Sequence, residues 1–99
     1  MLSWQPTQLG LTPNEAAWLV RACVGWDWRA EPLGALADEL RIRAEDALDS
    51  MGVPVIARLV DRLTNEQAVD VLTAVDRVIE GGRLDIASLT TAGLLSRRS

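Results

Sequence analysis

The stretch LADELRIRAEDALDSM, residues 36–51, decides the fold of this 99-residue chain, because it can be interpreted as one helix or as two. Its apolar residues keep the spacing of a single amphipathic helix, and only Ile42 lies opposite them. The pairs Glu39–Arg43 and Arg41–Glu45, at i,i+4 spacing, stabilise the helix only if it is continuous. We therefore predict one helix over about residues 32–51, with the apolar stripe Leu33, Leu36, Ala37, Leu40, Ala44, Ala47, Leu48 and Met51.

The same stretch also resembles the helix-turn-helix family of DNA-binding proteins. In that alignment Leu36, Ala37 and Leu40 lie on the first helix, Ile42 follows the turn, and Ala47 and Met51 face inward from the recognition helix. The resemblance covers residues 36–51 only and implies a DNA-associated transcriptional regulator.

Two features of the stretch favour the single helix. Arg41 occupies the turn position that Gly often fills in this family, where a left-handed backbone costs a residue with a Cβ about 1 kcal/mol or more. The supposed recognition helix carries Glu45, Asp46 and Asp49, whereas the DNA backbone attracts Lys and Arg. A structural helix-turn-helix that does not read DNA stays open as an alternative.

Capping signals place the remaining helices. A capping box formed by Thr12 and Glu15 predicts a helix from residue 12 to about residue 24. VPVIARLVDRL predicts a short helix over residues 53–63. A second capping box, Thr64 with Gln67, predicts a helix that Gly81-Gly82 ends, and a short helix is expected from Asp85.

The apolar stripes of these helices have one conspicuous exception. Trp18 falls on the polar side of the helix over residues 12–24, together with Asn14, Arg21 and Gly25. The apolar side of that helix holds Ala16, Leu19, Val20, Cys23 and Val24. The stripe of the helix from residue 64 holds Ala68, Val71, Leu72, Val75, Val78 and Ile79.

No segment alternates in the manner of a strand, so the predicted class is all-α. We expect a compact orthogonal or up-down bundle of four main helices plus a short C-terminal helix. Residues 1–11 are expected to be an irregular N-terminal arm, residues 12–82 the bundle, and residues 83–99 a short helix and a frayed tail.

The composition argues against an enzyme. The chain has no His and no Lys, and its single cysteine, Cys23, lies on the apolar side of its helix. A nucleophilic cysteine needs a base or a positive charge beside it, so we expect a small buried hydrophobe. Neighbouring acids on a helix diverge by about 100° and so do not converge on a metal or a substrate. We predict no catalytic residue, no cofactor and no metal site.

The charge pattern bears on the class of partner. Residues 31–50 carry six acids against two Arg, and the whole chain has a net charge of −4. This balance disfavours nucleic acid as a partner, although an acidic face can also imitate nucleic acid. No signal segment and no apolar run of the roughly 18 residues that a bilayer requires are seen, so we expect a cytoplasmic protein with no membrane partner.

Tryptophan and arginine are enriched where proteins bind one another. The candidate protein-interaction residues are Trp18, Arg21, Trp26, Trp28 and Ile42. For Trp26 and Trp28 a position in the core is the favoured interpretation, and Trp4 in the arm provides an alternative cover for Trp18.

The predicted function is therefore a small non-enzymatic protein-interaction module. It would act as an adaptor, inhibitor or assembly subunit, through self-association or by docking on a protein partner, and we expect no small-molecule substrate. The alternative is the DNA-associated regulator that the helix-turn-helix resemblance implies.

Overall fold

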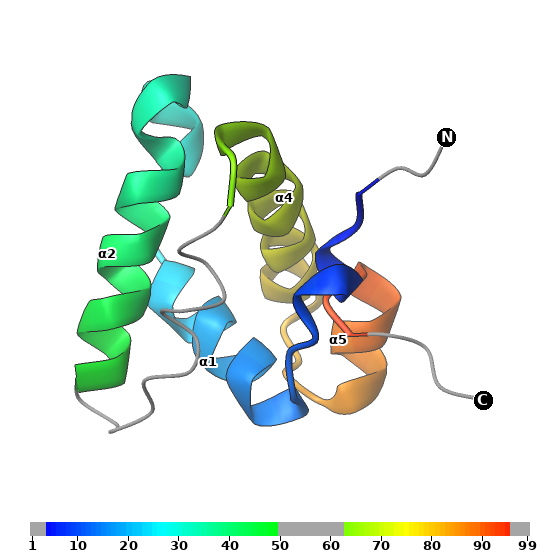
Figure 1. Ribbon diagram of the computed structural model, residues 1–99. Coiled ribbons are helices and arrows are strands. Elements are labelled where there is room, and N and C mark those ends of the chain that lie inside the picture. The colour runs from blue at the N-terminus through cyan, green and yellow to red at the C-terminus, as the bar shows by residue number, and fades with distance from the viewer. Residues whose placement is uncertain (1–3, 50–62, 96–99) are drawn as a thin grey trace.

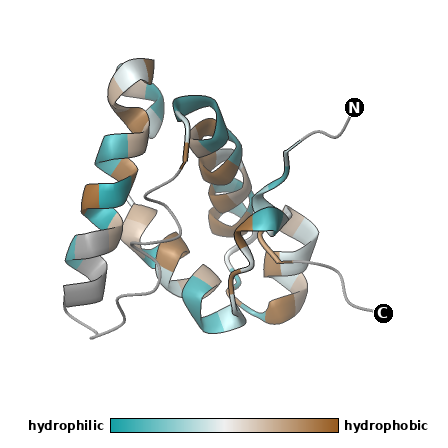
Figure 2. Ribbon diagram, in the orientation of Figure 1, coloured by the Kyte–Doolittle hydropathy of each residue, from teal (hydrophilic) through white to brown (hydrophobic). Residues whose placement is uncertain are grey.

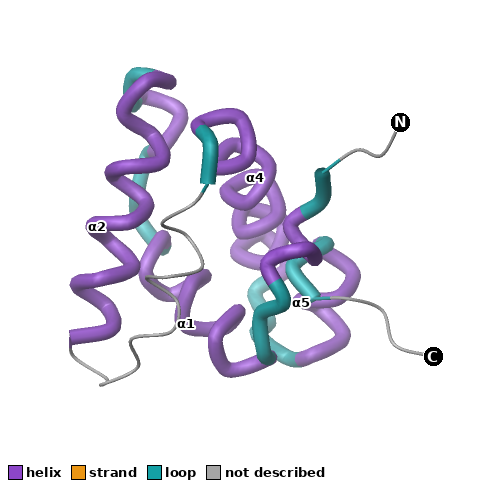
Figure 3. Tube along the Cα trace, viewed as in Figure 1, coloured by secondary structure: helices purple, strands orange, loops and turns teal. Residues whose placement is uncertain are grey.

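The computed structural model describes residues 4–49 and 63–95 (Figure 1). Four α-helices lie in these ranges: α1 (Pro13–Cys23), α2 (Leu36–Asp49), α4 (Asn65–Gly81) and α5 (Ile86–Ala92). Three short 3-10 turns accompany them: η1 (Pro6–Leu9), η2 (Trp28–Ala30) and η3 (Leu33–Ala35). No strand occurs in the described ranges, which confirms the all-α class (Figure 3). The helix predicted over residues 53–63 falls almost entirely outside them.

The α2 helix answers the question that residues 36–51 pose. It is continuous from Leu36 to Asp49, so Arg41 lies inside a helix and not at a turn. The chain enters it later than predicted, because residues 33–35 form η3. Leu33 is consequently 54% exposed, and the prediction that it belongs to the buried stripe is wrong. Leu36, Leu40 and Ala44 are buried as predicted.

Both predicted capping boxes are present. The Thr12 side chain accepts a hydrogen bond from the Glu15 backbone N–H at 3.2 Å, and the Glu15 carboxylate accepts one from the Thr12 N–H at 2.8 Å. Thr64 and Gln67 form the same reciprocal pair at the start of α4. Each box satisfies two backbone donors that the helix itself leaves unpaired, which explains why the two helices begin where they do.

Two helix ends expose side chains that the periodicity predicts to be buried. Helix α1 ends at Cys23, and Val24 has an extended backbone, so its side chain leaves the stripe and is 58% exposed. Helix α4 ends at Gly81, with Gly82 in the left-handed conformation at φ +71. Ile79, in the last turn of α4, is also exposed. Helical periodicity predicts burial correctly only where the helix continues and another part of the molecule covers that side of it.

Helix α4 is the centre of the molecule, since it contacts α1, α2, α5, η1 and η3. Figure 2 shows hydrophobic residues recurring along α2 and α4 between polar ones. The buried core takes side chains from all four helices and the loops, including Leu19, Val20, Leu40, Leu72, Val75 and Leu89. The segment predicted as an irregular arm contains η1, which contacts α4, and Leu11, which is buried. No helix in the described ranges is long and apolar enough to cross a membrane.

Candidate interaction surface

Two of the four tryptophans lie in the core. Trp26 and Trp28 follow α1 in the loop that leads to α2, and each is only 8% exposed. Their burial follows the core alternative for these residues and removes their rings from the surface of the single chain.

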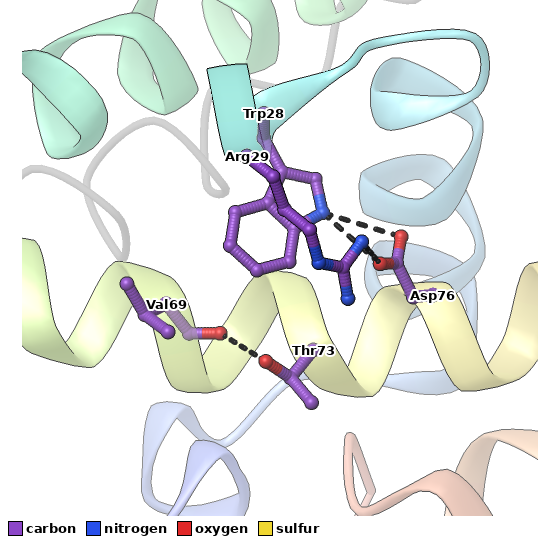
Figure 4. A network of polar contacts seen from close by, with 5 residues as sticks. All are labelled: Trp28, Arg29, Val69, Thr73 and Asp76. Carbon is purple, nitrogen blue, oxygen red and sulfur yellow. Dashed lines mark hydrogen bonds and ion pairs between the residues drawn. The ribbon is translucent and has the colours of Figure 1, made fainter. Parts of the chain in front are cut away.

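Trp28 is held by an acidic residue of α4 (Figure 4). Its indole N–H lies 3.2 Å from both carboxylate oxygens of Asp76. The guanidinium of Arg29 lies 4.3 Å from the centre of the Trp28 ring and 2.5 Å from the same carboxylate. Trp28 and Arg29, both in η2, thus share one acceptor on α4. The Trp28 ring lies between the Arg29 guanidinium and the core. This network fixes the loop on α4, so we assign it a structural role.

Trp26 fixes the same loop on α2. The Arg43 guanidinium lies 4.6 Å from the centre of its ring, and the indole nitrogen is 3.4 Å from a carboxylate oxygen of Glu31. The Nε atom of Arg43 is buried and has no hydrogen-bond partner in the described ranges. The sequence predicts an ion pair of Arg43 with Glu39, but the guanidinium stacks on Trp26 instead. A cation over an indole ring is an attractive contact that needs no carboxylate.

Trp18 and Arg21 form a pair on α1. They are one turn apart, and the Arg21 guanidinium lies 4.7 Å from the centre of the Trp18 ring. Trp18 is half-buried and packs against the edge of the core, while Arg21 is exposed. The fold thus covers part of the Trp18 side chain, and the Arg21 guanidinium lies over its ring.

Ile42 is the candidate apolar side chain that lies outside the core. It is 43% exposed in the middle of α2, two residues from buried Leu40 and two from buried Ala44. Two residues correspond to about 200° around a helix, so Ile42 lies on the side away from the core. Exposed Asp38 and Asp46 lie one turn before and one turn after it. We call Asp38, Ile42 and Asp46 the α2 outer face.

The charge of the α2 outer face is negative. Asp38 is 74% exposed at its side chain, and its carboxylate lies 3.8 Å from the Arg41 guanidinium, which offsets part of its charge. Asp46 and half-buried Glu39 add two further carboxylates on the same side of the helix. An apolar side chain surrounded by carboxylates is complementary to a surface that is apolar at its centre and basic at its rim.

Cys23 occupies the environment of a structural thiol. It is buried at the end of α1, and this burial raises the pKa of its thiol to about 12. The Arg43 guanidinium opposes this change and Asp76 adds to it, but both effects are smaller than that of desolvation. A thiol that stays protonated at neutral pH is a poor nucleophile. Within residues 4–49 and 63–95, no three metal-ligating side chains cluster together.

Two positioning residues were missed from the sequence. Asp76 is at an ordinary polar position of α4 by periodicity, and its pairing with Trp28 joins residues 48 apart. Asn65, in the first turn of α4, accepts a hydrogen bond at 3.0 Å from the Ala37 backbone N–H in the first turn of α2. Helix α2 therefore has one of its unpaired donors satisfied by another helix, which no local pattern reveals.

The structure brings the candidate residues together only in part. Trp18 contacts Arg21, whereas Trp26, Trp28 and Ile42 contact other partners or solvent. Comparisons of the chain with protein-family models, curated proteins and solved structures found no match.

Proposed function

We propose that this protein is a small non-enzymatic protein-interaction module, an adaptor, inhibitor or assembly subunit, that docks through the α2 outer face. Its partner is a basic segment of another protein with an apolar side chain at its centre. The observation that carries the proposal is Ile42, which is 43% exposed on the solvent side of a well-formed helix between Asp38 and Asp46.

Burial and charge would contribute differently to such a contact. Covering the exposed part of Ile42 contributes about 1 kcal/mol, since a full Ile side chain contributes roughly 1.5–3 kcal/mol. The carboxylates at the rim contribute mainly to the association rate and to the choice of partner, and salt weakens their effect. The Trp18–Arg21 pair on α1 is a second candidate contact of the type found at binding hot spots.

The regulator alternative depended on a turn at Arg41, and α2 is continuous through that residue. The acidic residues that the outer face presents would also repel a phosphate backbone. We therefore base the proposal on protein recognition.

Two synthetic amphipathic peptides with the same apolar stripe test the partner chemistry, one flanked by Lys and Arg and the other by Glu. Binding is followed by amide chemical shifts of the protein at several salt concentrations. We expect the basic peptide to shift the amides of residues 38–46, the acidic peptide to leave them unchanged, and added salt to weaken the binding.

Matched variants locate the contact. Ile42→Asp is expected to abolish peptide binding, whereas Ile86→Asp, which changes a still more exposed isoleucine on α5, is expected to leave it intact. Equal binding of both peptides, or equal loss in both variants, would contradict the proposal. A second copy of the chain would replace the basic partner if the protein forms a dimer that Ile42→Asp dissociates.

A further inference from the structure

The end of α4 and helix α5 enclose a groove on a part of the molecule that the proposed docking does not use. Its volume is about 280 Å³, which is at the small end for ligand-binding pockets. Arg77 and Arg83 line it, together with Asp85, Ser88 and Thr91. The groove therefore combines two cations with hydroxyl groups within one small concave surface.

Neither guanidinium group forms an ion pair with another residue that the structure describes. Both arginines are exposed, and the ion pairs formed within the described ranges involve other arginines, Arg29 and Arg41. Arg77 also lines a neighbouring groove of about 170 Å³ with Asp70, yet no ion pair joins these two residues. The donors of both groups thus remain available to a ligand.

Among the described residues that line the groove, Asp85 is the one carboxylate, and it is already engaged. Asp85 accepts a hydrogen bond at 2.8 Å from the Ser88 backbone N–H, and as the N-cap of α5 it uses this contact to begin the helix. The hydrogen bonds from the backbone and side chain of Ser88, with the nearby charge of Arg83, lower the pKa of Asp85. A lowered pKa keeps Asp85 ionised, so the described residues of the groove carry a formal charge of +1, from two arginines and one aspartate.

Short side chains leave the groove open to a compact ligand. Gly81, Ala87 and Ala92 line it, and a methyl group built at Gly81 would meet no atom within 4 Å. The Thr91 hydroxyl, which makes no hydrogen bond in the described ranges, adds a neutral donor next to the cations. Planar, multiply donating guanidinium groups beside a hydroxyl match the oxygens of a tetrahedral dianion.

We propose that this groove binds the phosphate group of a small phosphorylated molecule, with Arg77 and Arg83 as the charged donors and Thr91 as the neutral one. The site is separate from the α2 outer face, and either can fail without the other.

Inorganic phosphate is the probe, and the readout is the amide chemical shifts of the full chain at constant ionic strength, with chloride as the comparison salt. Saturable shifts of residues 81–92 with phosphate, and none with chloride, are expected. Arg77→Gln and Arg83→Gln should each weaken binding about fivefold, as for partly exposed charge contacts, and the double variant should abolish it.

Arg21→Gln is the matched control, because it removes the same charge from an exposed arginine on α1. If Arg21→Gln weakens binding as much as Arg77→Gln, general attraction explains the shifts and the site is refuted. Shifts that do not saturate, or that appear equally with chloride, refute it as well. Dispersed spectra of the variants verify that each is folded, so loss of binding cannot be confused with loss of structure.

Discussion

The indole nitrogen of Trp28 lies 3.2 Å from both carboxylate oxygens of Asp76, a residue 48 positions further along the chain. This contact joins the loop after α1 to the central helix α4 and satisfies the polar atom of a buried ring. Without Trp28, the carboxylate would keep one donor among the described residues, Arg29, whose side chain is 63% exposed. Together with the Asn65–Ala37 hydrogen bond, this network joins residues 4–49 to residues 63–95.

Trp28→Phe is expected to destabilise the fold by about 1–3 kcal/mol, because the substitution leaves a partly buried carboxylate with one donor fewer and removes part of a core ring. Chemical denaturation measures the change. Trp18→Phe, on a half-buried tryptophan whose nitrogen makes no hydrogen bond in the described ranges, is the control and should cost less. Equal losses would show that the Asp76 contact contributes nothing beyond ring volume.

Arg29→Gln is expected to cost less than about 1 kcal/mol, since exposed ion pairs contribute little and are screened by salt. A double-mutant cycle of Arg29→Gln with Trp28→Phe isolates the stacking and the shared acceptor. We expect a coupling energy of about 0.5–1 kcal/mol, as is typical of a cation stacked on an aromatic ring. Strict additivity would mean that the two residues act independently on Asp76.

Asn65→Ala is expected to destabilise the fold by about 1 kcal/mol, because the Ala37 N–H at the start of α2 loses its acceptor. Asn14→Ala is the matched control, since Asn14 is an exposed asparagine in the first turn of α1 with no side-chain hydrogen bond in the described ranges. Denaturation should separate the two variants, and hydrogen exchange should show faster opening at the first turn of α2 only in Asn65→Ala. If the exchange of this turn is unchanged, the cross-helix cap does not hold it.

The Cys23 thiol is expected to resist alkylation in the native protein, because burial raises its pKa to about 12 from an ordinary value of 9.0. Above pH 9 the unfolded chain releases this proton and the native chain does not. Stability should therefore fall as the pH rises from 9 towards 12. Cys23→Ala should reduce this fall, and the comparison is made by denaturation at pH 7 and pH 10.

Rapid native labelling of Cys23 at pH 7, at the rate found in denaturant, would contradict the burial on which this prediction rests.

Local patterns predicted the helices well. Capping boxes at Thr12 and Thr64 and the glycine pair after residue 80 are short-range chemistry, so their outcome depends on neighbours in the sequence. The continuity of α2 through Arg41 was predicted from the helical phase together with the charge pairs and the residue at the supposed turn. The errors occur at helix termini. Leu33 precedes α2 and Val24 follows α1, so both keep the helical spacing in the sequence but lie outside the α-helix.

Long-range contacts could not be predicted in the same way. Arg43 is equally suited to a pair with Glu39, and only the position of Trp26 across the α1–α2 loop decides between them. Asp76 and Asn65 look like ordinary surface residues until the loop and α2 are placed beside α4. The exposure of Ile42, in contrast, was predictable, because it depends only on the phase of a single helix.

Docking of a basic partner, as proposed, requires that the α2 outer face is open in the isolated protein. Molar mass by light scattering behind a sizing column, over a range of protein concentrations, measures whether it is. We expect one chain at every concentration, for the wild type and for Ile42→Asp alike. A dimer in the wild type that becomes a monomer in Ile42→Asp would show that a second copy already covers this face, and the proposed docking of a basic partner would then be wrong.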